Sequence, residues 1–212
     1  MFNVLIVGSV LASLIVPTVA DSSAAAAELA VVPSEKVTLQ VETVNGSGCP
    51  AGTATVTSAA DNTSFNVTYS DFVAEAGLGA SLVDFRKNCQ INVQVNVPKG
   101  FTFAIAQADY YGYAHLESGA IATQLASYYF TGEVPTAQTS HQFTGPFDGG
   151  WHATDKVAAL IWAPCGAQAN LNINAELRVA PLAATAAVTN YISMQRTKAS
   201  ARTVFNLSWK QC

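Results

Sequence analysis

The chain has 212 residues, of which 50% are hydrophobic and only 11% are charged. This length suits one well-filled domain, and the apolar content excludes intrinsic disorder. With 10 Lys and Arg against 14 Asp and Glu, the formal net charge is -4, so the chain has no basic surface to neutralise a phosphate backbone. Nucleic acid is therefore not an expected partner.

The N-terminus has the pattern of a secretory signal peptide. The chain is almost wholly apolar up to Val16, and the small residue Ala20 completes a segment that a signal peptidase accepts. We therefore predict a signal peptide over residues 1–20, a flexible leader over 21–35 and a single secreted β domain over 36–212. No later segment is long and apolar enough to span a bilayer, so no membrane partner is expected after cleavage.

From residue 36 onward, polar and apolar residues alternate in one segment after another. In the first segment Val37, Leu39 and Val41 point one way, and the residues between them point the other way. Such alternation is typical of strands that are buried on one face and wet on the other. The strands predicted in chain order cover residues 37–42, 53–57, 65–69, 91–97, 101–107, 120–130, 156–162, 171–179 and 203–209.

The connection Pro98-Lys99-Gly100 predicts a tight hairpin, because proline presets one turn dihedral and glycine accepts the left-handed position that follows. No long stretch with a helical period follows residue 36. Antiparallel strands with one apolar face must bury those faces against each other. We therefore predict an all-β fold, an antiparallel two-sheet β-sandwich of about ten strands, with a closed β-barrel as the alternative.

Four cysteines lie in the predicted mature chain, and an even count in an oxidising compartment predicts two disulfides. The sequence allows three pairings of Cys49, Cys89, Cys165 and Cys212. We favour Cys49 with Cys89 and Cys165 with Cys212, because each bond then closes one half of the chain. No two of these cysteines have the close spacing of a zinc site.

Four sequons for N-glycosylation fit a secreted glycoprotein from a eukaryotic source. Such tripeptides also arise by chance, so they give only modest support for export. The candidate glycosylation sites are Asn45, Asn62, Asn66 and Asn206.

Several short motifs, taken together, resemble one protein family. They are Asn45 to Thr53, Lys87 to Gln90, Val97 to Phe101, Tyr111 to Tyr113, Tyr129 to Gly132, Pro164 to Gly166, Leu171 to Asn174 and Leu207 to Cys212. The chain resembles the small secreted proteins of fungi, bacteria and oomycetes known as domain of unknown function 4360, over nearly the whole predicted mature chain. This resemblance implies secretion and a single cysteine-stapled domain, and it implies no activity, substrate or catalytic residue. The segment 183–201 departs most from the family pattern.

The sequence lacks the nucleophile elbow, the HExxH zinc motif, the phosphate loop and the calcium loop. The stretch that contains His141, Asp148 and His152 could bring two imidazoles and a carboxylate to one metal ion. Its glycines and Pro146 favour instead a surface loop with turns. No metal and no cofactor is therefore expected, and these three residues are only weak candidates for metal ligands.

A glycosidase would need two carboxylates that face each other across a cleft. The candidates are Asp109, Glu117, Asp148 and Asp155. Acidic residues scattered along a chain are more simply explained as solvated strand ends and turns. No catalytic residue is therefore assigned.

Aromatic residues gather in two stretches that look rich in turns. Tyr110, Tyr111 and Tyr113 lie in one stretch, and Phe147 and Trp151 lie in the other. Sugars stack on tyrosine and tryptophan rings while nearby amides bind their hydroxyls, so these five residues are candidates for binding a glycan or another surface. The alternative is that the rings fill the ends of the sandwich core.

These observations predict a secreted, non-enzymatic protein that acts as an extracellular or cell-wall-associated binding module. Its expected partner is a cell-wall glycan or an extracellular protein. Two alternatives remain open. One is a hydrolase of cell-wall polymer that uses a metal or carboxylate site, and the other is an effector-like protein that binds the proteins of another organism.

Overall fold

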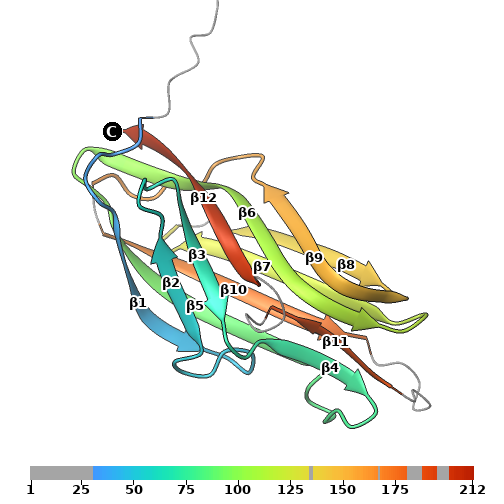
Figure 1. The fold of residues 1–212 in the computed structure, drawn as a ribbon. Helices are drawn as coiled ribbons and strands as arrows, with labels where there is room; N and C mark the ends of the chain where they lie inside the picture. Colours follow the sequence, from blue (N-terminus) through green and yellow to red (C-terminus); the bar gives the residue numbers. More distant parts are fainter. Residues whose placement is uncertain (1–30, 134–135, 167, 181–187, 195–200) are drawn as a thin grey trace, which may run out of the picture.

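The computed structural model describes residues 31–133, 136–166, 168–180, 188–194 and 201–212, so the predicted signal peptide and most of the predicted leader lie outside the described residues. Within the described residues the regular elements are all β-strands (Figure 1), and none of these residues forms a helix that could cross a membrane. The strands are β1 (Thr38–Asn45), β2 (Ala54–Ser58), β3 (Ser64–Tyr69), β4 (Val73–Gly77), β5 (Arg86–Asn96), β6 (Phe101–Leu116), β7 (Ile121–Phe130), β8 (Ala137–Thr144), β9 (Phe147–Lys156), β10 (Gln168–Val179), β11 (Thr189–Ser193) and β12 (Arg202–Gln211).

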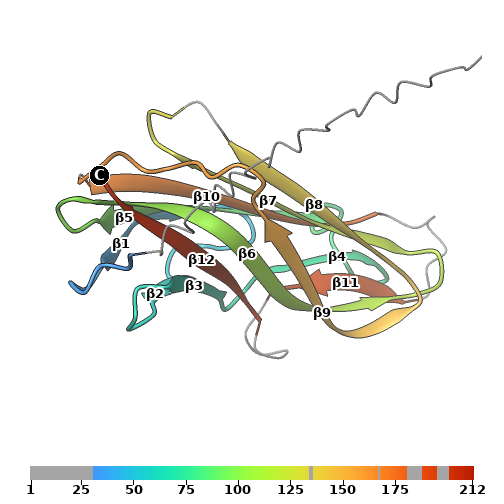
Figure 2. The same ribbon diagram turned by 90° about the horizontal axis from the view of Figure 1, so that it is seen from above.

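The strands form two antiparallel sheets that pack face to face. The five-stranded sheet has the order β1-β5-β10-β7-β8. The seven-stranded sheet has the order β2-β3-β12-β6-β11-β4. Its remaining strand, β9, pairs with the edge of β6 opposite to the edge that pairs with β12. Figure 2 shows the two layers from the edge. The fold confirms the predicted antiparallel two-sheet β-sandwich over the closed β-barrel.

Strand β10 illustrates how alternation builds the two layers. Its residues Leu171, Ile173 and Leu177 are at most 2% exposed and point toward the other sheet. Between them, Asn172 and Asn174 lie on the outer face. Because side chains alternate along a strand, one face of the sheet enters the core and the other remains available for a ligand.

Aromatic rings from both sheets fill the core. The Phe65 and Phe205 rings of the seven-stranded sheet stack with their centroids 4.8 Å apart. Tyr128 of the five-stranded sheet meets Phe205 edge-on at 5.9 Å, and Phe103 lies 5.5 Å from Trp209. Burial of each such side chain contributes roughly 1.5–3 kcal/mol, and the contact between Tyr128 and Phe205 joins the two sheets.

Two disulfides brace the sandwich, and they are the pairs favoured from the sequence. Cys49 and Cys89 are 40 residues apart, and both are buried beside the start of β5. Cys165 and Cys212 are 47 residues apart and exposed, and they tie the connection after β9 to the end of β12. Closing loops of this length stabilises the fold by about 4 kcal/mol per disulfide in the loop-entropy model.

Two local predictions are wrong. The strand predicted over residues 156–162 ends after Lys156, and within that segment only Trp162 forms an isolated bridge, with Ala104. The predicted hairpin at residues 98–100 forms its turn, with the Phe101 amide donating to the Pro98 carbonyl at 3.2 Å. That turn connects β5 of one sheet to β6 of the other, so it joins the two layers and does not form a hairpin.

The stretch from His141 to His152 is also not the loop that its glycines suggest. It forms the end of β8 and most of β9, which belong to different sheets. The chain changes sheets at Gly145, where an added Cβ would lie 1.9 Å from the Glu117 carbonyl oxygen. The glycine therefore permits a close approach of two backbones at a corner between strands.

Candidate functional site

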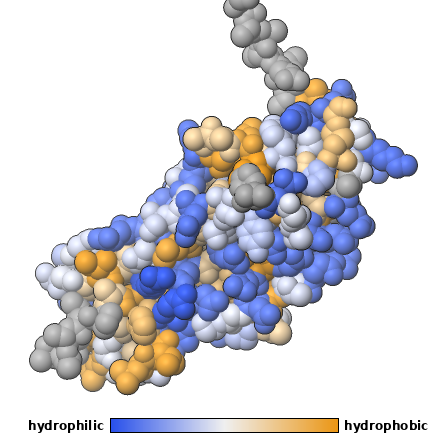
Figure 3. Space-filling view, turned by 180° about the vertical axis from the view of Figure 1, so that it is seen from behind, coloured by the Kyte–Doolittle hydropathy of each residue, from blue (hydrophilic) through white to orange (hydrophobic). Residues whose placement is uncertain are grey.

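The outer face of the five-stranded sheet is covered by amide and hydroxyl side chains, and we call it the amide face. The antiparallel register places Asn92 opposite Asn172 and Gln90 opposite Asn174. Seen from this side, the middle of the molecule is largely hydrophilic (Figure 3). The amide residues that alternate outward along β5 and β10 are Asn88, Gln90, Asn92, Gln94, Asn96, Gln168, Asn170, Asn172 and Asn174.

Two adjoining hollows lie on the amide face. The larger, about 220 Å³, crosses β5, β10, β7 and β8. The smaller, about 130 Å³, crosses β1, β5, β10 and β7. Both hollows are lined by Gln90 and Asn174, so they adjoin, and we call the two together the amide groove.

Side-chain hydrogen bonds hold the groove amides in place. Asn92 Nδ2 donates to Asn172 Oδ1 at 2.8 Å, and Asn172 Nδ2 donates to Thr131 Oγ1 at 2.9 Å. Asn174 Nδ2 donates to Ser127 Oγ at 3.5 Å. Each amide has two N–H donors and two acceptor lone pairs, so each retains hydrogen-bonding capacity for a ligand. Groups that are already oriented lose less entropy when a ligand binds.

One end of the groove carries charge. Glu176 accepts hydrogen bonds from Arg86 and Arg178, which lie directly opposite each other in the register of β5 and β10. The two arginine side chains are 51% and 48% exposed, whereas Glu176 is 14% exposed. Two guanidinium groups share one carboxylate, so this end has an excess of one positive charge.

The groove also has an apolar component on β7. Tyr129 lines the smaller hollow and pairs in register with Asn172. Leu125 lines the larger hollow and pairs in register with Glu176. A ligand in the groove would therefore contact a tyrosine ring and an aliphatic side chain beside the polar groups, as is usual for small-molecule sites.

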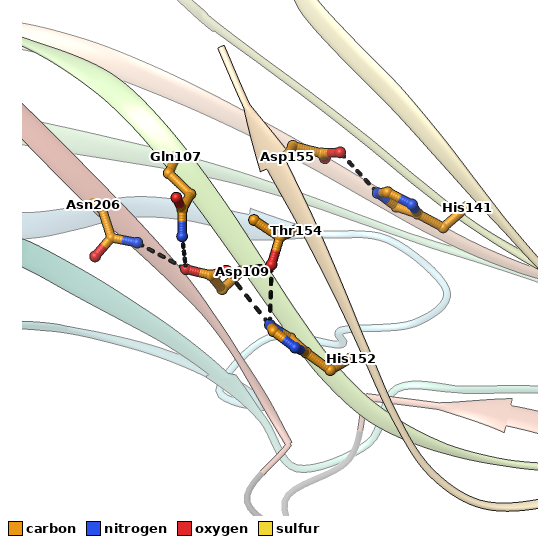
Figure 4. A network of polar contacts seen from close by, with 7 residues as sticks. All are labelled: Gln107, Asp109, His141, His152, Thr154, Asp155 and Asn206. Atoms are coloured by element: carbon orange, nitrogen blue, oxygen red, sulfur yellow. Dashed lines mark hydrogen bonds and ion pairs between the residues drawn. The ribbon is translucent and has the colours of Figure 1, made fainter.

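The outer face of the seven-stranded sheet holds a polar network around Asp109 (Figure 4). The Asp109 carboxylate accepts hydrogen bonds from Thr154 at 2.6 Å, Gln107 at 2.7 Å and Asn206 at 2.8 Å, and His152 Nε2 lies 3.4 Å away. Burial opposes ionisation of Asp109, but the donors around it outweigh burial and lower its pKa below the ordinary value. The network therefore holds an ionised carboxylate with its acceptor sites largely occupied.

Aromatic rings beside this network stack on their neighbours. The His152 ring lies 4.3 Å from the Tyr111 ring, and the Arg202 guanidinium lies 4.8 Å from the same ring. These two residues come from β9 and β12, which flank β6 on opposite sides, so both faces of the Tyr111 ring are covered. The Tyr113 hydroxyl donates to Asp148 at 2.7 Å, and this hydrogen bond raises the pKa of Tyr113.

The five aromatic candidates from the sequence do not share one surface. Tyr110 is 1% exposed and Trp151 is 5% exposed, and both belong to the core. Phe147 is partly buried and packs against the same core. Tyr111 and Tyr113 lie on the outer face, because successive residues of β6 point to opposite sides of the sheet.

The three weak metal candidates are also separated. Asp148 and His152 are exposed on the outer face of β9. His141 faces inward from β8, and its Nε2 lies 2.8 Å from Asp155. Among the described residues, no three His, Cys, Asp or Glu side chains are grouped so that they could hold a metal ion.

The carboxylate candidates form no pair across a cleft. Asp109 lies on the outer face of β6, and Asp155 points inward from β9. Glu117 and Asp148 lie 3.6 and 3.4 Å from the His115 ring nitrogens, and their side chains are 48% and 62% exposed. None of the four lines the amide groove.

The sequons occupy four different environments. Asn62 is 4% exposed, and its Nδ2 donates to two backbone carbonyls of the N-terminal segment. The Asn206 amide donates to the Asp109 carboxylate. Asn45 is exposed and lines the amide groove, and Asn66 is half-buried in β3 of the other sheet. The sites therefore differ greatly in their room for a glycan.

The sequence predictions do not include the amide groove. Its signal is present in the sequence, because Asn and Gln occupy alternating polar positions over residues 90–96 and 168–174. These positions are equally compatible with an ordinary wet strand face. Only the register of β5 and β10 shows that side chains 80 residues apart form one surface.

A family model and a curated relative match most of the chain. The model described as "Domain of unknown function (DUF4360)" matches residues 35–212. The relative is an "Uncharacterized secreted protein" of Arthroderma benhamiae, 33% identical over 180 residues, which is 84% of this chain and 73% of the relative. That relative is secreted, and the two disulfides of this chain fit an extracellular environment.

Proposed function

The chain belongs to the family of the Domain of unknown function (DUF4360), and from that premise we propose that it is a secreted, non-enzymatic module that binds polysaccharide through the amide groove. The observation that carries the proposal is the groove itself. Its two adjoining hollows are lined by oriented amides, hydroxyls and a tyrosine ring. Such a module would act at the cell wall or in the extracellular space.

The chemistry of the groove matches a sugar polymer. A pyranose has hydroxyls around its rim that both donate and accept hydrogen bonds, and an amide side chain offers both functions. A pyranose also has an apolar face, which Tyr129 can contact. From Asn172 to Arg178 the groove follows seven residues of β10, or about 20 Å, so it has room for several sugar units.

The charges of the groove support binding without hydrolysis. Glycoside hydrolysis uses two carboxylates on either side of the bond that breaks. Glu176 is the only acidic side chain among the described residues that line the two hollows, and it bridges two arginines. A groove with one neutralised carboxylate is suited to holding a polymer intact.

Retention on insoluble polysaccharide tests the proposal. We expect the protein to be retained on at least one of chitin, β-glucan, cellulose and pectin coupled to a resin. Asn172→Ala should weaken binding at least tenfold, because it removes the hydrogen bonds that link β10 to Asn92 and Thr131. Asn66→Ala changes the same residue type in the other sheet and should bind like the wild type. Failure of retention on every polymer, or equal loss in both variants, would refute the proposal.

A further inference from the structure

The charged end of the amide groove contains an arrangement that costs stability. Arg86 and Arg178 are cross-strand partners, and like charges directly opposite each other in a sheet repel. Glu176 neutralises one of them, and one positive charge remains. This excess occurs in a chain whose net charge is -4 and which has only 10 Lys and Arg in total.

Both guanidinium groups have more N–H donors than the Glu176 carboxylate can accept from. Each has five N–H donors in a planar fork, more than one carboxylate can accept, and Glu176 is bound by Nη2 of Arg86 and Nε of Arg178. About half of each arginine side chain is exposed, and both line the larger hollow. Arginine forks of this kind match the geometry of a carboxylate, which they bind through two parallel hydrogen bonds.

The charged end and the amide end belong to the same groove. Asn174 lies two residues from Glu176 on β10 and lines both hollows, and Asn88 lies between Arg86 and Gln90 on the outer face of β5. A ligand that spans the groove would therefore meet an anion-binding group at one end and neutral hydrogen-bonding groups along the rest.

We propose that the groove binds an acidic polysaccharide, with a uronic acid carboxylate on Arg86 and Arg178 and the hydroxyls of neighbouring units on the amides. This inference rests on the proposed function and names its substrate class. A single excess charge does not suit a polyphosphate backbone, for which affinity depends on neutralising many phosphates.

A matched pair of polymers shows how much the carboxylate charge contributes to binding. Polygalacturonate and its fully methyl-esterified form have the same backbone, and only the first carries charge. We expect the wild-type protein to bind polygalacturonate at least tenfold more tightly than the ester, measured by titration calorimetry at low salt. Added salt should reduce this preference. Equal affinity for the two polymers would overturn the inference.

Charge-matched variants assign the preference to the two arginines. Arg86→Gln and Arg178→Gln should each reduce the preference for polygalacturonate over the ester to less than threefold. Lys156→Gln removes one positive charge from the exposed outer face of β9 and should keep the preference. Retention of the preference in both arginine variants would overturn the inference, as would tighter binding of dextran sulfate than of polygalacturonate.

The two proposals can fail separately. Binding of the ester that depends on Asn172 but shows no preference for the acid would support the groove and overturn the uronic acid assignment. Absence of binding to every polymer would refute both. Thermal unfolding of each variant shows whether a loss of binding reflects a loss of folded protein.

Discussion

Asn62 attaches the N-terminal segment to the sandwich, and Asn62→Ala is expected to lower the free energy of unfolding by about 4 kcal/mol. The side chain accepts a hydrogen bond from the Val37 amide at 3.0 Å and donates to the Pro33 and Glu35 carbonyls at 2.9 Å each. Each bond contributes about 1 kcal/mol in such a buried place. Asn62 also has a φ of 57°, which alanine adopts at a cost of about 1 kcal/mol.

Urea unfolding followed by tryptophan fluorescence measures this loss, because the Trp209 indole N–H donates to the Asn62 carbonyl oxygen at 2.8 Å. The control is Asn66→Ala, which changes a half-buried asparagine on the outer face of β3 and should stay within about 0.5 kcal/mol of the wild type. A loss below about 1 kcal/mol in Asn62→Ala, or an equal loss in the two variants, would refute this account of the N-terminal attachment.

Further predictions concern modification, redox chemistry, pH and packing. Folded protein secreted from eukaryotic cells should carry no glycan on Asn62, since its amide nitrogen already makes two hydrogen bonds; a glycopeptide containing this site would contradict the prediction. Mild reductant should reduce the exposed Cys165–Cys212 disulfide before the buried Cys49–Cys89 disulfide. Alkylation of the freed thiols followed by mass spectrometry shows which disulfide is reduced first. Folding lowers the pKa of Asp109, so its stabilisation is present above the unfolded pKa of about 4 and is lost as pH falls through the folded pKa. Asp109→Asn should therefore reduce the dependence of the free energy of unfolding on pH in the acid range, and an unchanged dependence would contradict this role of Asp109. Gly112→Ala should lose about 2 kcal/mol in denaturant unfolding, because the new methyl group would lie 2.2 Å from both a backbone oxygen and an indole carbon.

Alternation in the sequence predicts the strands that have one wet face, and it fails for strands whose composition hides the pattern. The sequence of β10 clearly predicts a strand, because large aliphatic residues alternate with amides. Strands β8 and β9 do not, because small residues such as Gly149 and polar residues such as Thr139 and His141 occupy inward positions. Thr139 and His141 both bond to Asp155 across the sandwich, and no local pattern reveals such a contact.

The candidate site illustrates a different limit of sequence reasoning. Aromatic residues attract attention as possible sugar-binding groups, yet Tyr110 and Trp151 lie inside and Tyr111 is covered on both faces. The amides look unremarkable one at a time. Their significance depends on cross-strand register, which brings Asn92 beside Asn172 and which no single segment encodes.

The position of β12 has a consequence for biosynthesis. This strand lies between β3 and β6, so it alone joins the β2-β3 part of its sheet to the rest (Figure 1). Until residues 202–211 have been synthesised, the earlier strands cannot assemble that whole layer, and aromatic residues such as Phe65 lack their partner Phe205. The seven-stranded layer can therefore be completed only after the C-terminal strand has been synthesised.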